Sequence, residues 1–281
     1  MKRRGRLAAL LLAAALLLTG CGPSEAAPAP EPAAGAALEL HFFDAGAADA
    51  ILLTTENSAV LIDAGEKGFG KTILAYLEEK GVERLDYLIV THFDKDHVGG
   101  AAKVLNGIPV GTVLQSNQPK DSDEYENYVE ALAAAGLEPV TLRETERFVL
   151  DGVSFTVDPP RRTEYEQDSS NNSSLIVSAQ YGETRFLFPG DAQTQRLAEY
   201  LDTDPARCDV LKLPHHGRDE PLLEALLAAV KPTYAVISSS EAEPESAAVV
   251  EALESAGARV LLTRNRAVTL LSDGKTVRLQ E

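Results

Sequence analysis

The segment that most constrains the fold of this chain is a buried strand that runs directly into a group of polar side chains. Residues 86–91 (DYLIVT) form a nearly continuous apolar run, which is typical of a strand covered on both faces. The loop THFDKDHVGG follows at once, over residues 91–100. Loops at strand ends are where a rigid scaffold directs side chains into a shared site. The chain is therefore predicted to have a layered fold with a polar site at one edge of a sheet.

Four side chains in this loop can bind a metal and lie within six residues of one another: His92, Asp94, Asp96 and His97. In a turn, His92 and Asp94 can point one way while Asp96 and His97 reach a second point nearby, an arrangement suited to two neighbouring cations. The glycines at 99–100 would let the backbone approach other segments closely. The alternative is a polar surface loop in which Asp96 caps a helix.

A second group of candidate ligands follows two later strands. The motif FLFPGD ends in Asp191, and the strand over 209–213 runs into Pro214 and the pair His215-His216. Carboxylates can bridge two cations, and histidines supply neutral nitrogen donors. Each motif alone has an ordinary structural interpretation, but together the two groups hold four of the five histidines in the chain. Their combination predicts one metal site built from several strand ends.

Two further acids lie at strand ends, each before an Ala-Gly pair: Asp44 and Asp63. One interpretation is a simple turn signal. The other is a supporting role, in which the carboxylate accepts a hydrogen bond from the far N–H of a ligating histidine. His41 alternates into a strand and is assigned to the core or the surface rather than to the site.

Apolar periodicity predicts the remaining elements. Strands are expected over 38–43, 50–55, 59–65, 86–91, 110–115, 147–158, 174–188, 209–213, 233–237 and 259–262. Helices are expected from near residue 98 and over 122–135, 192–201, 220–230 and 245–256, and a terminal hairpin turns at 272–274. The order suggests two similar halves, each a sheet with helices on one face. Stacked together they would form a four-layer αββα sandwich of the α/β (α+β) class.

The N-terminal residues carry an export signal rather than part of this fold. Four basic residues precede a 12-residue apolar run over 7–18, which is too short to span a bilayer comfortably. The sequence Leu-Thr-Gly-Cys ending at Cys21 resembles a bacterial lipobox. We therefore expect a lipoprotein signal peptide (1–20), a lipidated Cys21 with a flexible Pro/Ala-rich tether (21–37) and one folded domain (38–281). The alternative is an ordinary signal peptide with a cysteine there by chance.

Net charge restricts the partners of this domain. The chain has 43 Asp and Glu against 26 Lys and Arg, for a net charge of −17. Such a surface repels phosphate backbones, so charge alone does not supply tight nucleic-acid binding without a local basic groove or bound cations. The chain contains no tryptophan and 6% aromatic residues, which argues against a platform for stacked bases.

Taken in order, the motifs resemble the metallo-β-lactamase fold superfamily, and most closely the hydrolase domain of ComEC-like competence (DNA-uptake) proteins. That branch shows DVGQGDA, LIDGG, THxDxDHxGG, NNxSLV, FLFTGD and DVLKxPHHGS. This chain shows FFDAGAADAILL, LIDAG, THFDKDHVGG, NNSSLIV, FLFPGD and DVLKLPHHGRD in the same order. The resemblance covers residues 38 to about 280, nearly all of the expected domain.

The resemblance implies an αββα sandwich with two divalent metal ions between the sheets. The positions that match ligands of the superfamily are His92, Asp94, Asp96, His97, Asp191 and one of His215 and His216, a choice that the motif leaves open. Other members often have histidine where this chain has Asp94, and a further histidine near the position of Asn172. More oxygen and fewer nitrogen ligands favour Mn²⁺, with Mg²⁺ as a further option, over Zn²⁺. Asp96 and Asp191 are also expected to orient the attacking water.

Two motifs depart from the pattern beside the expected site. The GQGD turn is replaced by Gly46-Ala47-Ala48-Asp49, and Arg218 replaces the serine after His-His-Gly. Asp49 and Arg218 are therefore candidates for supporting or substrate contacts, and both departures bear on the substrate more than on the metal.

The expected function is that of a lipid-anchored extracytoplasmic metal-dependent hydrolase, a phosphodiesterase or nuclease acting on DNA or a small phosphodiester. One alternative is a catalytically silent metal-binding lipoprotein of the same fold, and another is a hydrolase of a different small ester or lactone. A solute-binding lipoprotein would fit the anchor but has no need of the metal motifs. The membrane is the expected partner through the anchor, and no protein partner is predicted.

Overall fold

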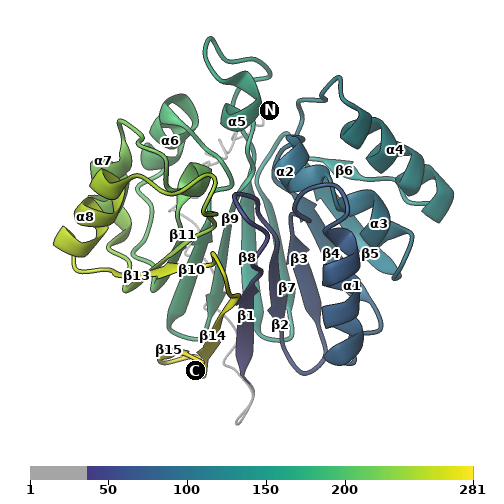
Figure 1. The fold of residues 1–281 in the computed structure, drawn as a ribbon, viewed down its shortest axis with the longest axis horizontal. Helices are drawn as coiled ribbons and strands as arrows, with labels where there is room; N and C mark the ends of the chain where they lie inside the picture. The colour runs from purple at the N-terminus through teal and green to yellow at the C-terminus, as the bar shows by residue number, and fades with distance from the viewer. Residues whose placement is uncertain (1–36, 281) are drawn as a thin grey trace, which may run out of the picture.

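Two β-sheets lie face to face in the computed structural model of this chain, which describes residues 37–280 (Figure 1). The predicted signal peptide (1–20), Cys21 and residues 22–36 of the predicted tether lie outside the described residues. Helices cover the outer face of each sheet, so the four layers follow the order αββα. The predicted fold class is confirmed.

The first sheet has eight strands, in the spatial order β15 (Val277–Leu279), β14 (Val268–Ser272), β1 (Leu38–Phe42), β2 (Ile51–Thr54), β3 (Ala59–Ile62), β4 (Leu85–Val90), β5 (Val110–Gln115) and β6 (Val140–Thr141). The second has seven strands, in the order β13 (Arg259–Leu262), β12 (Tyr234–Ile237), β11 (Val210–Lys212), β10 (Thr184–Phe188), β9 (Ile176–Tyr181), β8 (Val153–Asp158) and β7 (Glu146–Leu150). The strands that lead into the predicted site run parallel: β3 with β4, and β10 with β11. Their carboxyl ends therefore share one edge of each sheet.

Helices on the first sheet are α1 (Gly70–Glu79), α2 (Lys95–Val98), α3 (Ala101–Leu105) and α4 (Asp123–Ala135). Helices on the second sheet are α6 (Thr194–Leu201), α7 (Leu223–Val230) and α8 (Ala247–Ser255). The short helix α5 (Ser169–Asn172) and the 3₁₀ turn η1 (Pro214–Gly217) belong to loops at strand ends. Within residues 37–280, the helices fall short of the length and apolar character that crossing a bilayer requires.

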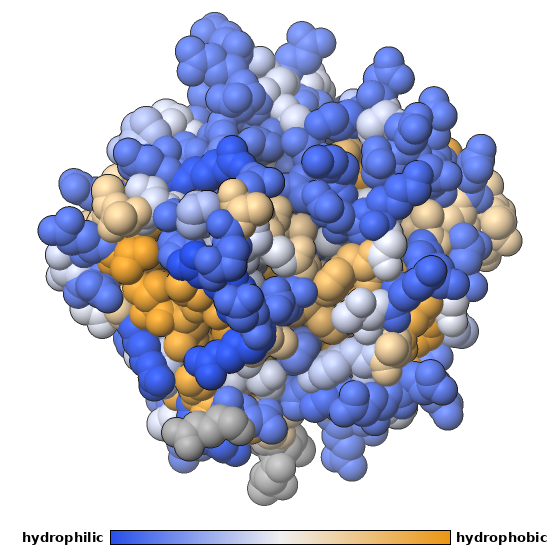
Figure 2. Space-filling model, viewed as in Figure 1, coloured by the Kyte–Doolittle hydropathy of each residue, from blue (hydrophilic) through white to orange (hydrophobic). Residues whose placement is uncertain are grey.

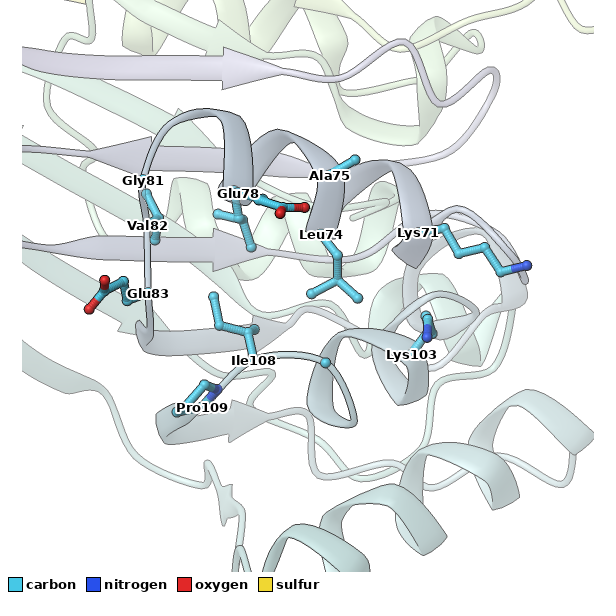
Figure 3. A pocket seen from close by; sticks show the side chains of 12 residues that line it. Lys71, Leu74, Ala75, Glu78, Gly81, Val82, Glu83, Lys103, Ile108 and Pro109 are labelled. Atoms are coloured by element: carbon cyan, nitrogen blue, oxygen red, sulfur yellow. The ribbon is translucent and has the colours of Figure 1, made fainter.

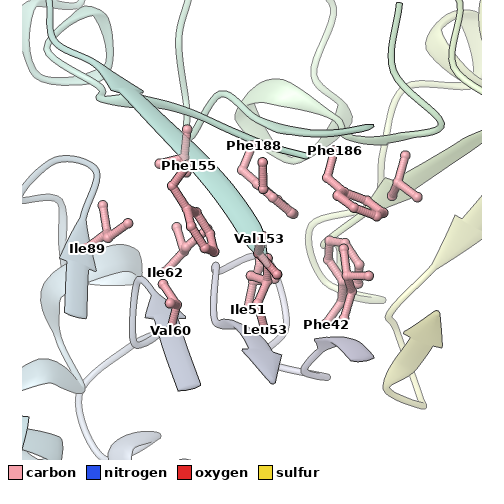
Figure 4. Packing of buried hydrophobic residues seen from close by; sticks show 14 of the residues in the cluster. Phe42, Ile51, Leu53, Val60, Ile62, Ile89, Val153, Phe155, Phe186 and Phe188 are labelled. Atoms are coloured by element: carbon pink, nitrogen blue, oxygen red, sulfur yellow. The ribbon is translucent and has the colours of Figure 1, made fainter. Parts of the chain in front are cut away.

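The core between the sheets takes apolar side chains from both of them (Figure 4). Phe42 of β1 and Phe188 of β10 meet across it with their ring centroids 6.1 Å apart. Along β4, Ile89 faces this core while Leu88 and Val90 face the helices. Both faces of β4 are thus covered, which explains the apolar run in its sequence. Burying each side chain of this size contributes about 1.5–3 kcal/mol.

The predicted terminal hairpin is present as β14 and β15, but it does not complete the second half of the chain. Strand β14 pairs antiparallel with β1, with Leu40 opposite Leu270, in the first sheet. The prediction that each half of the sequence forms its own sheet is therefore wrong at this point. Val268 and Leu270 face the core between the sheets, and the pairing covers an edge of β1 that would otherwise be exposed.

The helix predicted to begin near residue 98 is replaced by two short helices that are separated by the glycine pair. The close packing expected for these glycines is present. A Cβ atom on Gly100 would lie 2.1 Å from the carbonyl oxygen of Ala64. Gly100 N also donates to Gly65 O at 3.0 Å, and Ala64 N donates to His97 O at 2.8 Å. The backbone around α2 is therefore fastened to the end of β3.

Candidate metal centre

Four side chains from both sheets converge at one end of the sandwich: Asp96, His97, Asp191 and His216. One ligand atom from each lies within 4.8 Å of the others. Asp96 and His97 belong to α2, which follows β4 of the first sheet, whereas Asp191 follows β10 and His216 follows β11 of the second. Figure 1 shows α2 and α5 at this same end, the top of the view. We call these four residues the quartet.

The distances in the quartet bring its carboxylates and imidazoles to a common centre. Nε2 of His216 lies 3.1 Å from Oδ2 of Asp191 and 3.3 Å from Oδ2 of Asp96. Nε2 of His97 lies 3.3 Å from Oδ1 of Asp191. His97, Asp191 and His216 are buried, and Asp96 is partly exposed at the open side. Ionisable side chains that are buried this close together are expected to pair with one another or to bind a metal ion.

Asp63 fixes the orientation of His97 through a contact with the ring nitrogen that faces away from Asp191. Its Oδ2 lies 2.8 Å from Nδ1 of His97 and also accepts from the Thr91 hydroxyl at 2.7 Å. Its Oδ1 accepts from Thr91 N at 2.8 Å. Because a carboxylate only accepts, Nδ1 of His97 donates, and Nε2 is directed toward Asp191.

His92 stands beside the quartet, with its ring centroid 4.1 Å from that of His97. Its Nδ1 lies 3.1 Å from the Thr91 hydroxyl oxygen, which already gives its proton to Asp63. His92 therefore donates from Nδ1 and leaves a lone pair on Nε2. Burial and the neighbouring His97 hold the pKa of His92 below its ordinary value, so the ring is neutral, as a metal ligand requires.

Asp94 is turned away from the quartet. Its Oδ1 pairs with the ammonium of Lys120 and with the hydroxyl of Ser170, which belongs to α5. Asp94 and Lys120 are both partly exposed at this edge. The structure thus brings His92 to the centre and leaves Asp94 at its rim.

The donor set fits a divalent cation. Nδ1 of His216 lies 3.2 Å from the carbonyl oxygen of Ser238 and donates to it, so all three imidazoles have Nδ1 engaged. Among the described residues, Nε2 of His92, His97 and His216 and Oδ1 of Asp191 are buried with no hydrogen-bond partner. Buried polar atoms of this kind call for a ligand, and nitrogen and carboxylate donors at one point are metal ligands.

Electrostatics within the quartet favours bound positive charge. Burial alone lowers the pKa of His216, but the neighbouring carboxylates of Asp191 and Asp96 raise it to about 9. Burial likewise raises the pKa of Asp191, but His216 and His97 hold it well below its ordinary value. The carboxylate is therefore ionised at neutral pH, ready to bind a cation.

The two adjacent histidines, which the sequence could not distinguish, point to different places. Both have left-handed backbone angles, with φ of 49° at His215 and 53° at His216. His216 joins the quartet, whereas Nδ1 of His215 lies 2.9 Å from Glu220 and 2.9 Å from Gln193. Nε2 of His215 lies 3.4 Å from Nδ2 of Asn171. His215 thus lines the wall of the site rather than its centre.

Of the residues predicted to support the site, Asp49 lies beside the quartet, whereas Asp44 and Arg218 lie on the surface. Asp49 is buried, its Oδ1 is 3.7 Å from Nδ1 of His216, and its backbone N donates to Asp96 O. Asp44 is exposed. Arg218 forms an ion pair with Glu243 at 2.7 Å, and both of these side chains are exposed.

Asn172, which the sequence places near the position of a further ligand, has its side chain bonded within the loop and to α6. The side chain of Asn172 accepts from Arg196 N at 2.9 Å and donates to Gln167 O at 2.9 Å, so it holds the loop around α5. The adjacent Asn171 is the residue that reaches His215. A one-residue ambiguity in a loop turns a side chain to a different side, and no periodicity resolves it.

Comparison with known proteins now identifies the family. The model of the metallo-beta-lactamase superfamily matches residues 43–240. The chain belongs to the metallo-beta-lactamase superfamily. Membership supports metal-dependent hydrolysis as the class of activity, and the His/Asp quartet supports binding of a divalent metal.

Curated relatives support the ComEC-like branch of the superfamily. The chain is 31% identical over 182 residues to ComE operon protein 3 of Bacillus subtilis (strain 168), covering 61% of this chain and 22% of that protein. It is 30% identical over 232 residues to competence protein ComA of Neisseria gonorrhoeae, covering 82% of this chain and 30% of that protein. The chain spans less than a third of the length of these relatives.

Solved structures share the superfamily fold. The metallo-beta-lactamase fold protein YhfI from Bacillus subtilis has a TM-score of 0.57 at 9% identity, covering 84% of this chain and 99% of that one. Igni18, a metallo hydrolase from the hyperthermophilic archaeon Ignicoccus hospitalis, has a TM-score of 0.53 at 19% identity, covering 83% and 98%. At these identities the likeness concerns the fold alone.

Two lysines near the quartet received no role from the sequence: Lys120 at its rim and Lys212 beside it. Lys120 reaches Asp94 from the loop after β5, a contact that nothing in the local sequence indicates. Lys212 ends β11 and is fully buried against Asp49. The sequence does contain a signal for Lys212, because a lysine inside an apolar strand is buried and therefore needs a carboxylate partner. Burial lowers the pKa of Lys212, but Asp49 and Asp191 raise it above its ordinary value.

Other surface features lie away from the centre. Hydrophilic residues dominate the upper part of the face shown in Figure 2, at the end where α2 and α5 lie. A groove between α1 and the turn before β5 is lined by Leu74, Ile108 and their neighbours (Figure 3). It contains none of the predicted site residues, and its charged side chains do not converge on one point as they do in the quartet.

Proposed function

We propose that the chain is a metal-dependent phosphodiesterase that acts outside the cytoplasmic membrane, on a small phosphodiester or on DNA. The observation that carries this proposal is the convergence of Asp96, His97, Asp191 and His216 with buried imidazole nitrogens that have no hydrogen-bond partner among the described residues. A purely structural polar cluster would satisfy those atoms internally.

Two divalent cations, Mn²⁺ or Zn²⁺ with Mg²⁺ as a further option, are proposed for this centre. The quartet would hold one, and His92 with Asp191 would hold the other. Asp94, which the sequence predicts as a further ligand, would have to leave Lys120 and Ser170 to join them. Such cations supply Lewis acidity, which polarises a phosphoryl oxygen and makes water more acidic. The high share of carboxylate oxygen in the donor set favours Mn²⁺.

The chain's own residues prepare the centre for this chemistry. Asp63 holds the ring of His97 in one orientation, so the imidazole does not have to be ordered when the substrate binds. Asp96 and Asp191 present carboxylate oxygens that can accept hydrogen bonds from the attacking water and orient it. Lys120 sits at the partly exposed rim, where its ammonium can attract an anionic ester.

The substrate class rests on the branch and on charge. Relatives named for competence favour a phosphodiester substrate. A net charge of −17 opposes tight binding of a long duplex, so a short strand or a small phosphodiester is favoured. The same relatives suggest association with the cell envelope, which agrees with the lipid anchor proposed at Cys21.

Anchoring can be tested separately from activity. Replacing Cys21 by alanine should move the protein from the membrane fraction to the soluble fraction of the extracytoplasmic compartment. A Cys208→Ala variant is the matched control, because that buried thiol belongs to the folded domain. Equal distribution of the Cys21→Ala variant and the wild type would contradict the anchor.

Activity is tested by combining metals with substrates. The metal-free protein is supplied with Mn²⁺, Mg²⁺ or Zn²⁺ and assayed on plasmid DNA, bis-p-nitrophenyl phosphate and a lactone. We expect hydrolysis of the phosphodiester that requires the metal and is lost in Asp96→Ala and His97→Ala. The exposed Asp204 supplies a matched control, Asp204→Asn, which should retain activity. Hydrolysis that survives both site substitutions would reject the proposal.

The alternative of a silent metal-binding lipoprotein is favoured by one observation. Arg218, which replaces a serine of the family motif, is engaged with Glu243 rather than with the centre. Tight binding of metal without hydrolysis of any substrate would support this alternative. Cleavage of the lactone alone would instead support a different ester substrate.

A further inference from the structure

A buried ion pair between Lys212 and Asp49 joins the two sheets beside the quartet. Lys212 is the last residue of β11 and is fully buried, and the Asp49 side chain is 2% exposed in the turn between β1 and β2. Nζ of Lys212 contacts Oδ2 of Asp49 and lies 3.7 Å from Oδ1 of Asp191. The ammonium is therefore next to a carboxylate of the quartet.

Stability alone is a weak reason for such a pair. Removing two charges from water is costly, and a buried ion pair can often be replaced by apolar residues without loss of stability. What distinguishes this pair is its location. Asp49 also belongs to a second group of potential ligands, with Asp63 and His97, whose ligand atoms lie within 4.8 Å of one another. That group contains two carboxylates, and the ammonium of Lys212 contacts one of them, Asp49.

We propose that Lys212 is a positioning residue that serves as a fixed internal cation: its ammonium neutralises Asp49 and sets the affinity of the quartet for divalent metal. The inference rests on the proposed function, because it takes the quartet to be a metal centre. Lys212 would keep Asp49 from acting as an additional ligand and would limit the negative charge that the centre presents.

The two members of the pair should influence metal binding in opposite directions. Without the ammonium, Asp49 is left as an unpaired carboxylate near the quartet, and the added negative charge attracts a divalent cation. Without the Asp49 charge, the ammonium is left to Asp191 alone and repels the cation. Coulomb interactions over a few ångströms in a buried site are strong, so each effect should be measurable. Removing both charges should largely cancel the effects.

The experiment is a double-mutant cycle read by calorimetric titration of the metal-free protein with Mn²⁺ alone. Lys212→Met should bind Mn²⁺ roughly tenfold more tightly, and Asp49→Asn roughly tenfold more weakly, than the wild type. The double variant Lys212→Met/Asp49→Asn should lie within about threefold of the wild type, and so should the charge-conserving Lys212→Arg. Circular dichroism checks that each variant is folded.

A purely structural pair would give a different pattern. Shifts of both single variants in the same direction, or no shift in either, would overturn the inference. If Lys212→Met fails to fold, Asp49→Asn is compared with the double variant instead. The inference then requires the double variant to bind Mn²⁺ about tenfold more tightly than Asp49→Asn. If the wild type itself binds no Mn²⁺, Mg²⁺ or Zn²⁺, the proposed function falls together with the inference. If the wild type binds metal without the opposite shifts, only the inference falls.

Discussion

Oδ2 of Asp63 lies 2.8 Å from Nδ1 of His97, although the two residues are 34 positions apart in the chain. The contact joins the end of β3 to α2 and turns Nε2 of His97 toward Asp191, 3.3 Å away. Asp63 takes a left-handed backbone conformation to make it, with φ of 57°. A carboxylate in this position fixes both the orientation and the tautomer of the imidazole.

Replacing Asp63 by asparagine should therefore weaken metal binding without touching a ligand. The amide carries no charge, and its N–H₂ group cannot accept from both Thr91 and His97. Loss of an outer partner of this kind typically costs about 10–100-fold in metal affinity, and we expect a decrease in that range for Mn²⁺ in a calorimetric titration. The exposed Asp204→Asn is the control, and equal affinities of the two variants would contradict the orienting role.

The adjacent histidines provide a sharp internal comparison. His216→Ala removes an imidazole whose Nε2 faces both Asp96 and Asp191, and should lower Mn²⁺ affinity by more than about 100-fold. His215→Ala removes a side chain bonded to Glu220 and should leave the metal content of the purified protein unchanged. Metal analysis of both variants decides the point, and loss of metal in His215→Ala alone would reverse the assignment.

Gly100 tests whether the close packing of the backbone positions the centre. A Cβ here would lie 2.1 Å from the backbone oxygen of Ala64, which cannot move without shifting β3 or α2. Gly100→Ala should destabilise the fold by about 3 kcal/mol in urea denaturation and also weaken Mn²⁺ binding. Gly136→Ala is the control, because that glycine has φ of 68° but nothing within 4 Å. It should cost about 1 kcal/mol and leave metal affinity intact.

The pH dependence of stability should contain a contribution from His41. Burial lowers the pKa of His41 to about 4, from an ordinary value of 6.5. The unfolded chain therefore binds the proton more readily between these values, and stability falls as the pH drops from 6.5 toward 4. The stability advantage of the wild type over His41→Asn should shrink by about 2 kcal/mol between pH 7.5 and 4.5. Urea denaturation at both pH values measures it, and a difference independent of pH would contradict the burial effect.

The four-layer fold and the stretches that meet at its edge could be predicted from the sequence. Short apolar runs located strands such as β5 and β13 at their observed bounds, because a strand that packs on both faces needs apolar side chains on both. The apolar run of β4 indicated a strand covered twice. The six motifs in order indicated the family, and the strand-end positions of His97 and Asp191 indicated a shared centre.

Which side chains face that centre depends on tertiary contacts that the local sequence does not show. His215 and His216 are neighbours with the same chemistry, and unusual backbone angles send them to different partners. Two other contacts join segments that are distant in the chain. They are the pairing of the terminal hairpin with β1 and the ion pair between Lys212 and Asp49. Local sequence sets the conformation of a few residues at a time, whereas these contacts depend on how two whole sheets pack against each other.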